Sequence, residues 1–298
     1  MPGTKKIQFK SLNLGNTKKQ SYLISEERDF PSIDSPAQRR YLLCSTPRSG
    51  SNLLSDALHA TGQAGDPLEY LNPNLMAAWL RAHPSFGDTL DLARYFRDLE
   101  ARRTSPSGIF GIKTHYSQLA GVWAGSQADQ LEFLGRFQAV IFVTRRNKVA
   151  QAVSFHRANQ TQLWTSEDRR FLDAGDPRLS VQPRFDEAAI TKTLADVLAQ
   201  EASWRALFAK AKCKQLEVVY EDVIANRPAQ LKRLFDWVGL PPQTTAPEPR
   251  IMRQSQDKDP MVSQFLRLIG QEATDAQLKP HQVEIAKTVD ALEPSTTT

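Results

Sequence analysis

The sequence predicts an α/β fold in which helices flank a parallel sheet. Four short apolar runs have the length and β-branched content of buried strands, and they occupy residues 40–46, 108–113, 137–144 and 216–220. The segments between them carry apolar residues at helical spacing. Strands that alternate with helices favour a parallel sheet with right-handed crossovers. The 298 residues suffice for one such domain with extra helices.

Three helical patterns support this class. The first follows the first predicted strand, in "SGSNLLSDALHATG", and Gly62 supplies its stop signal. The second is "NKVAQAVSFHRANQTQLW" at 147–164. The third spans 186–210, where one face collects Ile190, Leu194, Val197, Trp204 and Phe208. The charged stretch at 167–185 contains Pro and Gly and predicts a long loop or lid.

Composition along the chain predicts one main domain at 39–270. Residues 1–38 are polar, basic and weakly patterned, so we interpret them as an N-terminal extension. Residues 271–298 are expected to form a C-terminal helix and a disordered tail that ends in "EPSTTT". No internal repeat occurs.

Charge and cysteine content narrow the function classes. The formal net charge of +5 suits an anionic ligand, although Lys and Arg on solvated faces would give the same total. No basic stripe interleaved with aromatic residues occurs, so we expect no nucleic-acid partner. Two cysteines cannot form a disulfide framework, and no Cys/His cluster suggests a metal site. We therefore expect no metal.

Hydrophobic segments are too short for a membrane span. No stretch reaches the ~18 apolar residues that a spanning helix needs, and the start "MPGTKKIQFKSLNLGN" lacks the apolar core of a signal peptide. We therefore expect a cytoplasmic protein. Peripheral contact with a membrane-surface acceptor is compatible with this expectation.

The stretch "CSTPRSGSNLL" has the outline of a phosphate-binding loop. A small-residue loop between a strand and a helix gathers backbone N–H donors and the positive end of the helix dipole around one point. An ATP-binding Walker A loop would read G-x-x-x-x-G-K-[ST], but here Ser49 and Ser51 flank Gly50, and the cation is Arg48. We expect a P-loop-like site for a group less charged than a triphosphate, with Asn52 as a further contact. For this motif alone, an ordinary turn with a capping serine is the alternative.

Four sequence blocks resemble the 3′-phosphoadenosine-5′-phosphosulfate (PAPS) dependent sulfotransferases, and most closely the bacterial trehalose 2-sulfotransferase family. They are "STPRSGSNLL" with "ATGQAGDPLEYL", then "GIFGIKTHYSQL", then "RRNKVAQAVSFHRANQTQLW", and more weakly "LEVVYEDV" with "RQSQDKD" at 253–259. The resemblance spans 41–165 strongly and 216–270 loosely. It implies a sulfotransferase that uses PAPS as co-substrate.

The resemblance also implies donor-binding residues. In this family the first loop binds the 5′-phosphosulfate, and an Arg at a helix start with a Ser eight residues later binds the 3′-phosphate. Arg146 and Ser154 have that spacing, and Arg145 is the alternative. Eight residues is a little over two helical turns, so both groups share a face only if Arg146 belongs to the helix start. The implied donor contacts are Arg48, Ser49, Gly50, Ser51, Asn52, Arg146 and Ser154.

Two residues compete as the general base. Glu69, in "GDPLEYL", matches the carboxylate base of the trehalose sulfotransferases, and Asp66 matches a neighbouring acceptor-binding position where the relatives carry Glu. His115, in "IKTHYSQL", resembles the His that follows a strand in animal cytosolic sulfotransferases. A carboxylate base needs its pKa raised by burial, whereas histidine titrates near neutrality in general. We favour Glu69, because the surrounding blocks look bacterial, and His115 stays as the alternative.

Two cations complete the predicted catalytic set. Lys113 lies two residues before His115 and therefore on the same face of the predicted strand. We expect Lys113 to bind the sulfonate and Arg48 to stabilise the charge that builds on the departing phosphate.

The acceptor is less well determined by the sequence. Phe155, Trp164 and Tyr70 are candidates for acceptor or adenine contacts, although aromatic residues at such positions are more often core. We expect a carbohydrate or glycolipid acceptor. Asp66 in place of Glu, together with the unmatched segment at 167–185, puts trehalose itself in doubt. Related enzymes form homodimers, but no periodicity here indicates an interface. The alternatives are a nucleotide or sugar kinase with an atypical loop, and a non-catalytic nucleotide-binding module.

Overall fold

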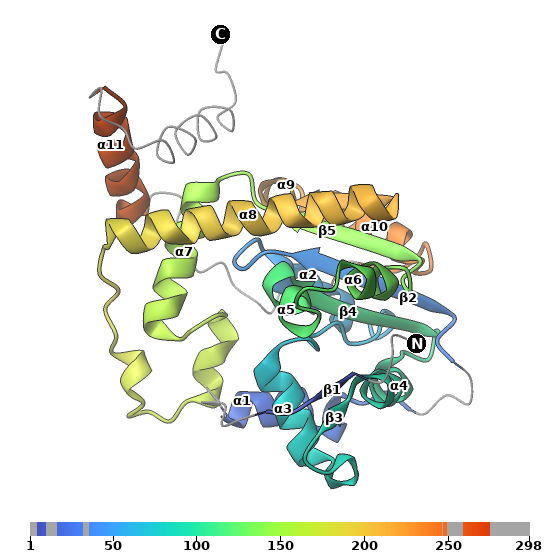
Figure 1. Ribbon diagram of the computed structural model, residues 1–298. Helices are drawn as coiled ribbons and strands as arrows, with labels where there is room; N and C mark the ends of the chain where they lie inside the picture. Colours follow the sequence, from blue (N-terminus) through green and yellow to red (C-terminus); the bar gives the residue numbers. More distant parts are fainter. Residues whose placement is uncertain (1–4, 10–16, 32–35, 246, 249–258, 275–298) are drawn as a thin grey trace.

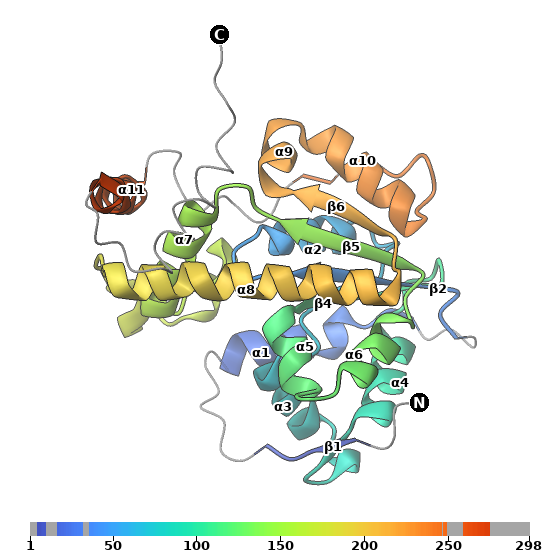
Figure 2. The ribbon, with the colours of Figure 1, turned by 45° about the horizontal axis from the view of Figure 1, so that its top comes forward.

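The computed structural model describes residues 5–9, 17–31, 36–245, 247–248 and 259–274 (Figure 1). A four-stranded sheet lies at the centre, and helices cover both of its faces (Figure 2). Most of the weakly matched "RQSQDKD" stretch and the predicted tail lie outside the described residues.

The four predicted strands are confirmed. They are β2 (Arg39–Ser45), β4 (Ile109–His115), β5 (Ala139–Thr144) and β6 (Gln215–Val219). Their order across the sheet is β4-β2-β5-β6, and each pair of neighbours is parallel. The predicted parallel α/β class is therefore confirmed. A second, two-stranded sheet pairs β1 (Lys6–Ile7) with β3 (Leu90–Asp91), and the sequence patterns did not predict it.

Helices connect the strands and extend beyond them. The three predicted helices are confirmed as α2 (Ser51–Ala60), α7 (Lys148–Thr161) and α8 (Glu187–Ala211), whereas α3 (Pro73–Ala82), α4 (Leu92–Arg103) and α6 (Gln127–Leu134) were not predicted. The stretch at 167–185 is a loop with two short 3₁₀ turns, as predicted. The helices are α1 (Thr17–Leu23), α2 (Ser51–Ala60), α3 (Pro73–Ala82), α4 (Leu92–Arg103), α5 (Tyr116–Val122), α6 (Gln127–Leu134), α7 (Lys148–Thr161), α8 (Glu187–Ala211), α9 (Tyr220–Ala225), α10 (Arg227–Val238) and α11 (Pro260–Thr274).

Alternate residues of each strand enter different cores, because successive side chains point to opposite faces of a sheet. Tyr41 and Leu43 of β2 pack with α2 and α10 on one face. Leu42 and Cys44 pack on the other face, with residues of α4, α5, α6 and α8. All four side chains are fully buried, which explains why the strand reads as a continuous apolar run.

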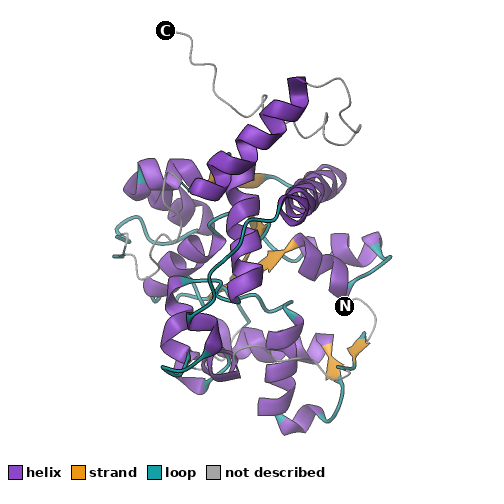
Figure 3. Cartoon of the chain, turned by 90° about the vertical axis from the view of Figure 1, so that its left-hand side faces the viewer, coloured by secondary structure: helices purple, strands orange, loops and turns teal. Residues whose placement is uncertain are grey.

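The sheet has a switch point beside β2. The chain places β4 on one side of β2 and β5 on the other, and crevices in parallel sheets open at such points, outside the carboxyl ends of the strands. Ser45 ends β2 directly beside His115, which ends β4. Figure 3 views the molecule from the side on which β5 leads into α7, and loops cross in front of the sheet there.

The described part of the N-terminal segment from α1 onward packs on this side of the molecule (Figure 1). Helix α1 lies against α3, and it also contacts the 3₁₀ turn at Ser166–Phe171 (Figure 1). A 3₁₀ turn at Glu26–Arg28 continues the segment. The predicted domain boundary at Arg39 stays a prediction.

Candidate active site

A cavity of about 710 Å³ opens at the carboxyl edge of the sheet. Its walls come from the loop after β2, the start of α2, the segment before α3, the ends of β4 and α7, and helix α1. Most predicted site residues line this one cavity. They are Arg48, Gly50, Ser51, Asn52, Glu69, Lys113, His115 and Ser154.

The loop after β2 forms a backbone cradle at one end of the cavity. Gly50 has a φ of 91°, and a Cβ there would lie 2.5 Å from the Tyr220 ring, so glycine is required on both counts. Gln151 of α7 donates to the Thr46 hydroxyl (2.8 Å) and to the Pro47 carbonyl (2.7 Å), which fixes the loop from behind. The N-terminus of α2 follows directly. The first N–H groups of a helix have no partners within it, so they can bind an anion here.

Ser49 is fully buried behind this cradle rather than on the cavity wall. Its hydroxyl makes no hydrogen bond to any residue that the structure describes. A buried hydroxyl without a partner is costly, so this group is suited to turn toward a ligand held by the loop. The predicted direct contact of Ser49 stays a prediction.

Arg48 crosses the cavity from the loop to α7. It adopts a φ of 64°, and its Nε donates to the Ser154 hydroxyl (2.9 Å), while Nη1 donates to the Trp164 carbonyl. Burial, together with the charge of Arg145, lowers the pKa of Arg48 to about 10. Two buried cations side by side favour binding of an anion between them.

The structure brings Arg145, and not Arg146, to the cavity. Strand β5 ends at Thr144 and α7 begins only at Lys148, so Arg146 lies in the turn before the helix. Its guanidinium is 44% exposed and binds Asp222 at 2.8 Å, outside the cavity. Arg145 is buried, lines the cavity and lies 5.0 Å from the centre of the Tyr220 ring. The condition for the predicted Arg146 spacing is not met, and Arg145, the alternative, is the arginine that lines the cavity; which of the two binds the 3′-phosphate stays a prediction.

Glu69 is the centre of a polar network at the other end of the cavity. Its Oε1 lies 2.9 Å from Lys113 Nζ and 3.4 Å from His115 Nε2. Its Oε2 accepts from Gln118 Nε2 (2.6 Å) and from Asn72 Nδ2 (3.3 Å). The side chain remains 23% exposed, so a ligand in the cavity can still reach it.

The pKa of Glu69 differs from the predicted direction. Burial alone raises it, but the Lys113 ammonium and His115 outweigh burial and hold the pKa of the carboxyl well below its usual range. Glu69 is therefore ionised at neutral pH, ready to accept a proton but a weak base while Lys113 faces it. Lys113 Nζ also donates to the side-chain oxygen of Asn52, so it lies between Glu69 and the phosphate loop.

Both ring nitrogens of His115 are engaged within the protein. Nδ1 lies 2.9 Å from the Ser45 hydroxyl, and Nε2 faces Glu69. A general base needs a free lone pair directed at the proton that it removes. Both oxygens of Glu69 also have partners, but its side chain is 23% exposed against 13% for His115, so Glu69 is the more accessible of the two to a ligand.

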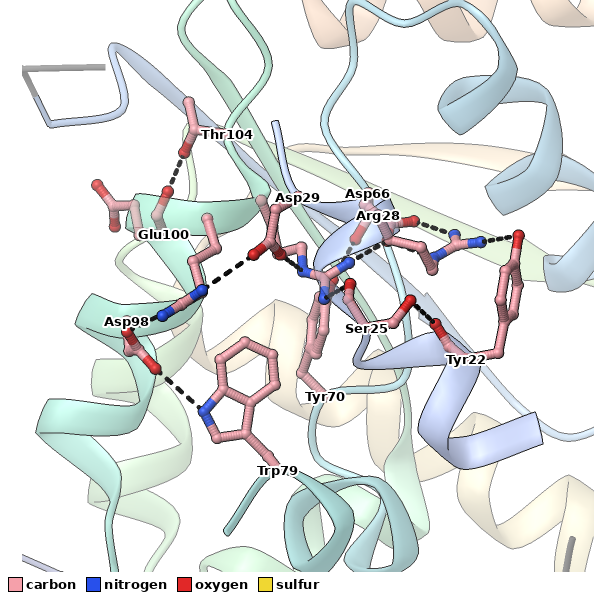
Figure 4. Close-up of polar contacts among 12 residues, drawn as sticks. Tyr22, Ser25, Arg28, Asp29, Asp66, Tyr70, Trp79, Asp98, Glu100 and Thr104 are labelled. Carbon is pink, nitrogen blue, oxygen red and sulfur yellow. Dashed lines mark hydrogen bonds and ion pairs between the residues drawn. The ribbon is translucent and has the colours of Figure 1, made fainter. Parts of the chain in front are cut away.

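Asp66 lies outside the cavity wall, in the protein interior. It is fully buried, and Arg28 binds it through two hydrogen bonds of 2.5 and 2.9 Å (Figure 4). Arg103, also fully buried, adds a third at 3.2 Å, and His59 Nδ1 lies at the same distance. The arrangement makes Asp66 an anchor for the N-terminal segment, so the predicted acceptor contact lacks a direct route to the cavity.

Of the three predicted aromatic contacts, two line the cavity and one lies in the core. Phe155 and Trp164 line the cavity, with ring centroids 5.9 Å apart. Tyr70 is fully buried, and its hydroxyl donates to the Asp66 carbonyl (2.8 Å). Tyr70 thus belongs to the core.

Sequence reasoning missed several cavity residues. Gln118 and Asn72 hold Glu69, but single amides carry no motif that would mark them. Tyr22 and Lys19 lie in the segment interpreted as a weakly patterned extension. Arg145 was predicted as the alternative to Arg146, and it directly follows a strand that ends at the carboxyl edge.

Two features are absent from the described part of the chain. It contains no group of three or more His, Cys, Asp or Glu side chains that could hold a metal ion. It also contains no helix that is both long and apolar enough to cross a membrane.

Comparisons with known proteins show the family of this chain. Residues 40–267 match the family described as Stf0 sulphotransferase. The trehalose 2-sulfotransferase of Mycobacterium tuberculosis is 29% identical over 255 residues, covering 75% of this chain and 92% of the relative. That of Mycolicibacterium smegmatis is 27% identical over 259 residues, covering 76% and 94%. A sulfotransferase structure from Alicyclobacillus acidocaldarius aligns over 87% of this chain and 96% of its own, with a TM-score of 0.46 and 12% identity. The chain belongs to the Stf0 sulfotransferase family and is a sulfotransferase.

Proposed function

We propose that this protein transfers the sulfonate group of PAPS to a hydroxyl of a carbohydrate or glycolipid acceptor. One observation carries the proposal: a single cavity joins a cationic phosphate cradle at one end to an ionised carboxylate at the other. The trehalose 2-sulfotransferases among the relatives support a carbohydrate as the acceptor class.

The residues at the cradle end fit a doubly phosphorylated adenosine. Backbone N–H groups at the start of α2 and the buried Ser49 hydroxyl would bind the 5′-phosphosulfate. Arg145 and Ser154 would bind the 3′-phosphate, with Arg48 between the two phosphates. An anion in this place offsets the repulsion between Arg48 and Arg145 that lowers the pKa of Arg48.

The other end fits activation of the acceptor. The acceptor oxygen attacks sulfur, the bond between sulfur and the 5′-phosphate oxygen breaks, and the hydroxyl proton passes to Glu69. Lys113 would then move its interaction from Glu69 to the transferring sulfonate, which strengthens Glu69 as a base. Charge accumulates on the departing phosphate oxygen, where Arg48 stabilises it. The products are 3′,5′-phosphoadenosine and the sulfated sugar.

Ligand binding tests the donor first. The melting temperature of the full chain is measured with 3′,5′-phosphoadenosine and, separately, with ATP and magnesium. We expect a concentration-dependent rise with 3′,5′-phosphoadenosine and a smaller one with ATP. Arg145→Ala should weaken 3′,5′-phosphoadenosine about tenfold or more, whereas Arg146→Ala, the matched control on the neighbouring residue, should not. If Arg146→Ala weakens binding and Arg145→Ala does not, the 3′-phosphate is bound by Arg146.

Transfer tests the reaction. The protein is incubated with radiolabelled PAPS and a panel of mono- and disaccharides and lipid-linked glycans, and labelled products are separated. Label in a saccharide is the expected result. Binding of 3′,5′-phosphoadenosine without transfer to any saccharide would contradict a carbohydrate acceptor, and a preference for ATP with magnesium would contradict the donor.

A further inference from the structure

Helix α1 forms part of the cavity wall although it precedes the family match, which begins at residue 40. Lys19, Gln20, Tyr22 and Leu23 all line the cavity. The cavity of this chain therefore has a wall that the matched family region does not supply.

Two ion pairs with buried carboxylates hold this wall in place. Lys19 binds Asp168 at 2.7 Å, and Arg28 binds Asp66 at 2.5 Å. The two carboxylates have side chains that are 4% and 0% exposed. Breaking a buried pair leaves an uncompensated charge, so these pairs hold α1 and the 3₁₀ turn that follows it against the rest of the protein.

The wall contacts two parts of the cavity. Helix α1 packs against α3, which begins just after Asn72, a hydrogen-bond partner of Glu69. Figures 1 and 2 both show α1 beside α3. Helix α1 also contacts the 3₁₀ turn at Ser166–Phe171. The helix is therefore placed to meet a ligand that extends from Glu69 toward this turn.

Tyr22 gives this wall an aromatic surface beside two guanidinium groups. Its ring lies 5.4 Å from that of Phe171, which also lines the cavity. The guanidinium groups of Arg28 and Arg170 lie over the Tyr22 ring, 5.4 and 4.9 Å from its centre, and Arg28 also donates to the Tyr22 hydroxyl at 3.4 Å. A sugar ring suits this group of side chains, because its C–H face can pack on the aromatic rings while its hydroxyl groups accept from the guanidinium groups.

We propose that Tyr22 is a specificity-determining residue that stacks against a second sugar ring of the acceptor, next to the ring that is sulfated. This inference rests on the proposed carbohydrate acceptor. It extends the proposed function by assigning an acceptor subsite to a helix outside the family match and by predicting a preference for at least a disaccharide.

The test compares full-length Tyr22→Ala, Tyr22→Phe and Ser21→Ala. Ser21 is exposed on the same helix and does not line the cavity, so it is the matched control. With the best disaccharide from the panel, Tyr22→Ala should raise KM about fivefold or more, a size typical of a buried aromatic contact, with kcat nearly unchanged. Tyr22→Phe and Ser21→Ala should remain within about twofold of the wild type.

Two further measurements separate stacking from a general structural effect. The KM for the corresponding monosaccharide should be the same in Tyr22→Ala and the wild type, as should the Kd of 3′,5′-phosphoadenosine. A Tyr22→Ala enzyme with an unchanged disaccharide KM would overturn the inference while the proposed function stands. Equal losses for both saccharides, or weaker 3′,5′-phosphoadenosine binding, would also overturn it.

Saccharide binding is measured apart from transfer, by fluorescence of the cavity residue Trp164 in the presence of 3′,5′-phosphoadenosine. Failure of the wild type to bind or sulfate any saccharide overturns both proposals. Binding that weakens in Tyr22→Ala but not in Ser21→Ala supports the subsite independently of catalysis.

Discussion

The two ends of the cavity have opposite effects on the charged form of a buried side chain. At the phosphate-loop end, burial and Arg145 lower the pKa of Arg48 to about 10, so the protein disfavours the charged form. At the other end, burial raises the pKa of Glu69, but Lys113 and His115 hold it well below its usual range, so the charged form is favoured. At the phosphate-loop end, an anionic ligand can neutralise the positive charge. At the other end, partners within the protein already neutralise the negative charge of Glu69.

This difference predicts different costs of mutation at the two ends. A cation at the phosphate-loop end should matter for binding and turnover but contribute little to stability, because its neighbours repel it. A charged residue near Glu69 should also contribute to stability, because its removal leaves buried partners with an uncompensated charge. Turnover and the free energy of unfolding, measured on the same variants, therefore test whether the two ends differ.

The largest effect on stability is expected at Asp66. Asp66→Asn leaves Arg28 and Arg103 without a charged partner in the interior, and breaking such a pair costs about 3–5 kcal/mol. Urea unfolding of the variant and the wild type measures the cost. Asp222→Asn is the control, since its pair with Arg146 is exposed and should contribute less than about 1 kcal/mol. Equal effects of the two substitutions would show that Asp66 is not an anchor.

The largest effect on catalysis is expected at Arg48. Arg48→Ala removes the cation beside the departing phosphate, so turnover should fall by about a hundredfold or more. The free energy of unfolding should change by less than about 1 kcal/mol, because the loss of two hydrogen bonds is offset by relief of repulsion from Arg145. Steady-state kinetics and urea unfolding on the same samples test both statements. A destabilisation as large as that of Asp66→Asn would remove the contrast between the two ends.

The phosphate-loop end was largely predictable from the sequence. Its parts are contiguous, and a strand, a loop of small residues and a helix N-terminus form a cradle whatever surrounds them. Arg48, Gly50, Ser51 and Asn52 therefore line the cavity as the spacing indicated. The choice between Arg145 and Arg146 was not fixed, since a shift of one residue at a strand end reverses the direction of a side chain.

The other end was predictable only in part. Lys113 and His115 are two residues apart on one strand, so their shared direction follows from the strand period. Asp66 lies behind this end, outside the cavity wall, and its partners are 38 and 37 positions away in the chain, so no local pattern indicates these pairs. The same applies to Tyr22, whose place in the cavity depends on ion pairs that form only in the folded chain.

Substitution of Glu69 decides which group is the base. Glu69→Gln keeps the shape but removes the proton acceptor, so turnover should fall by about a hundredfold. His115→Gln should cost less than about tenfold, because both ring nitrogens are engaged by Ser45 and Glu69. Turnover at saturating acceptor and donor gives the comparison. If His115→Gln has the larger effect, the histidine is the base and Glu69 orients it.

The smallest expected effect is the pH dependence of the stabilisation that Glu69 contributes. Because the pKa of Glu69 lies below its usual value of 4.5, the unfolded chain takes up the proton first as the pH falls. The stabilisation from Glu69 is therefore fully present above about pH 5 and is lost as the pH falls through the native pKa. The difference in unfolding free energy between the wild type and Glu69→Gln should be constant from pH 5 to 8 and should shrink below about pH 4. Acid titrations of both proteins at fixed urea measure it. A difference that already shrinks between pH 7 and 5 would mean that Lys113 and His115 do not hold Glu69 ionised, and the two ends would then be electrostatically alike.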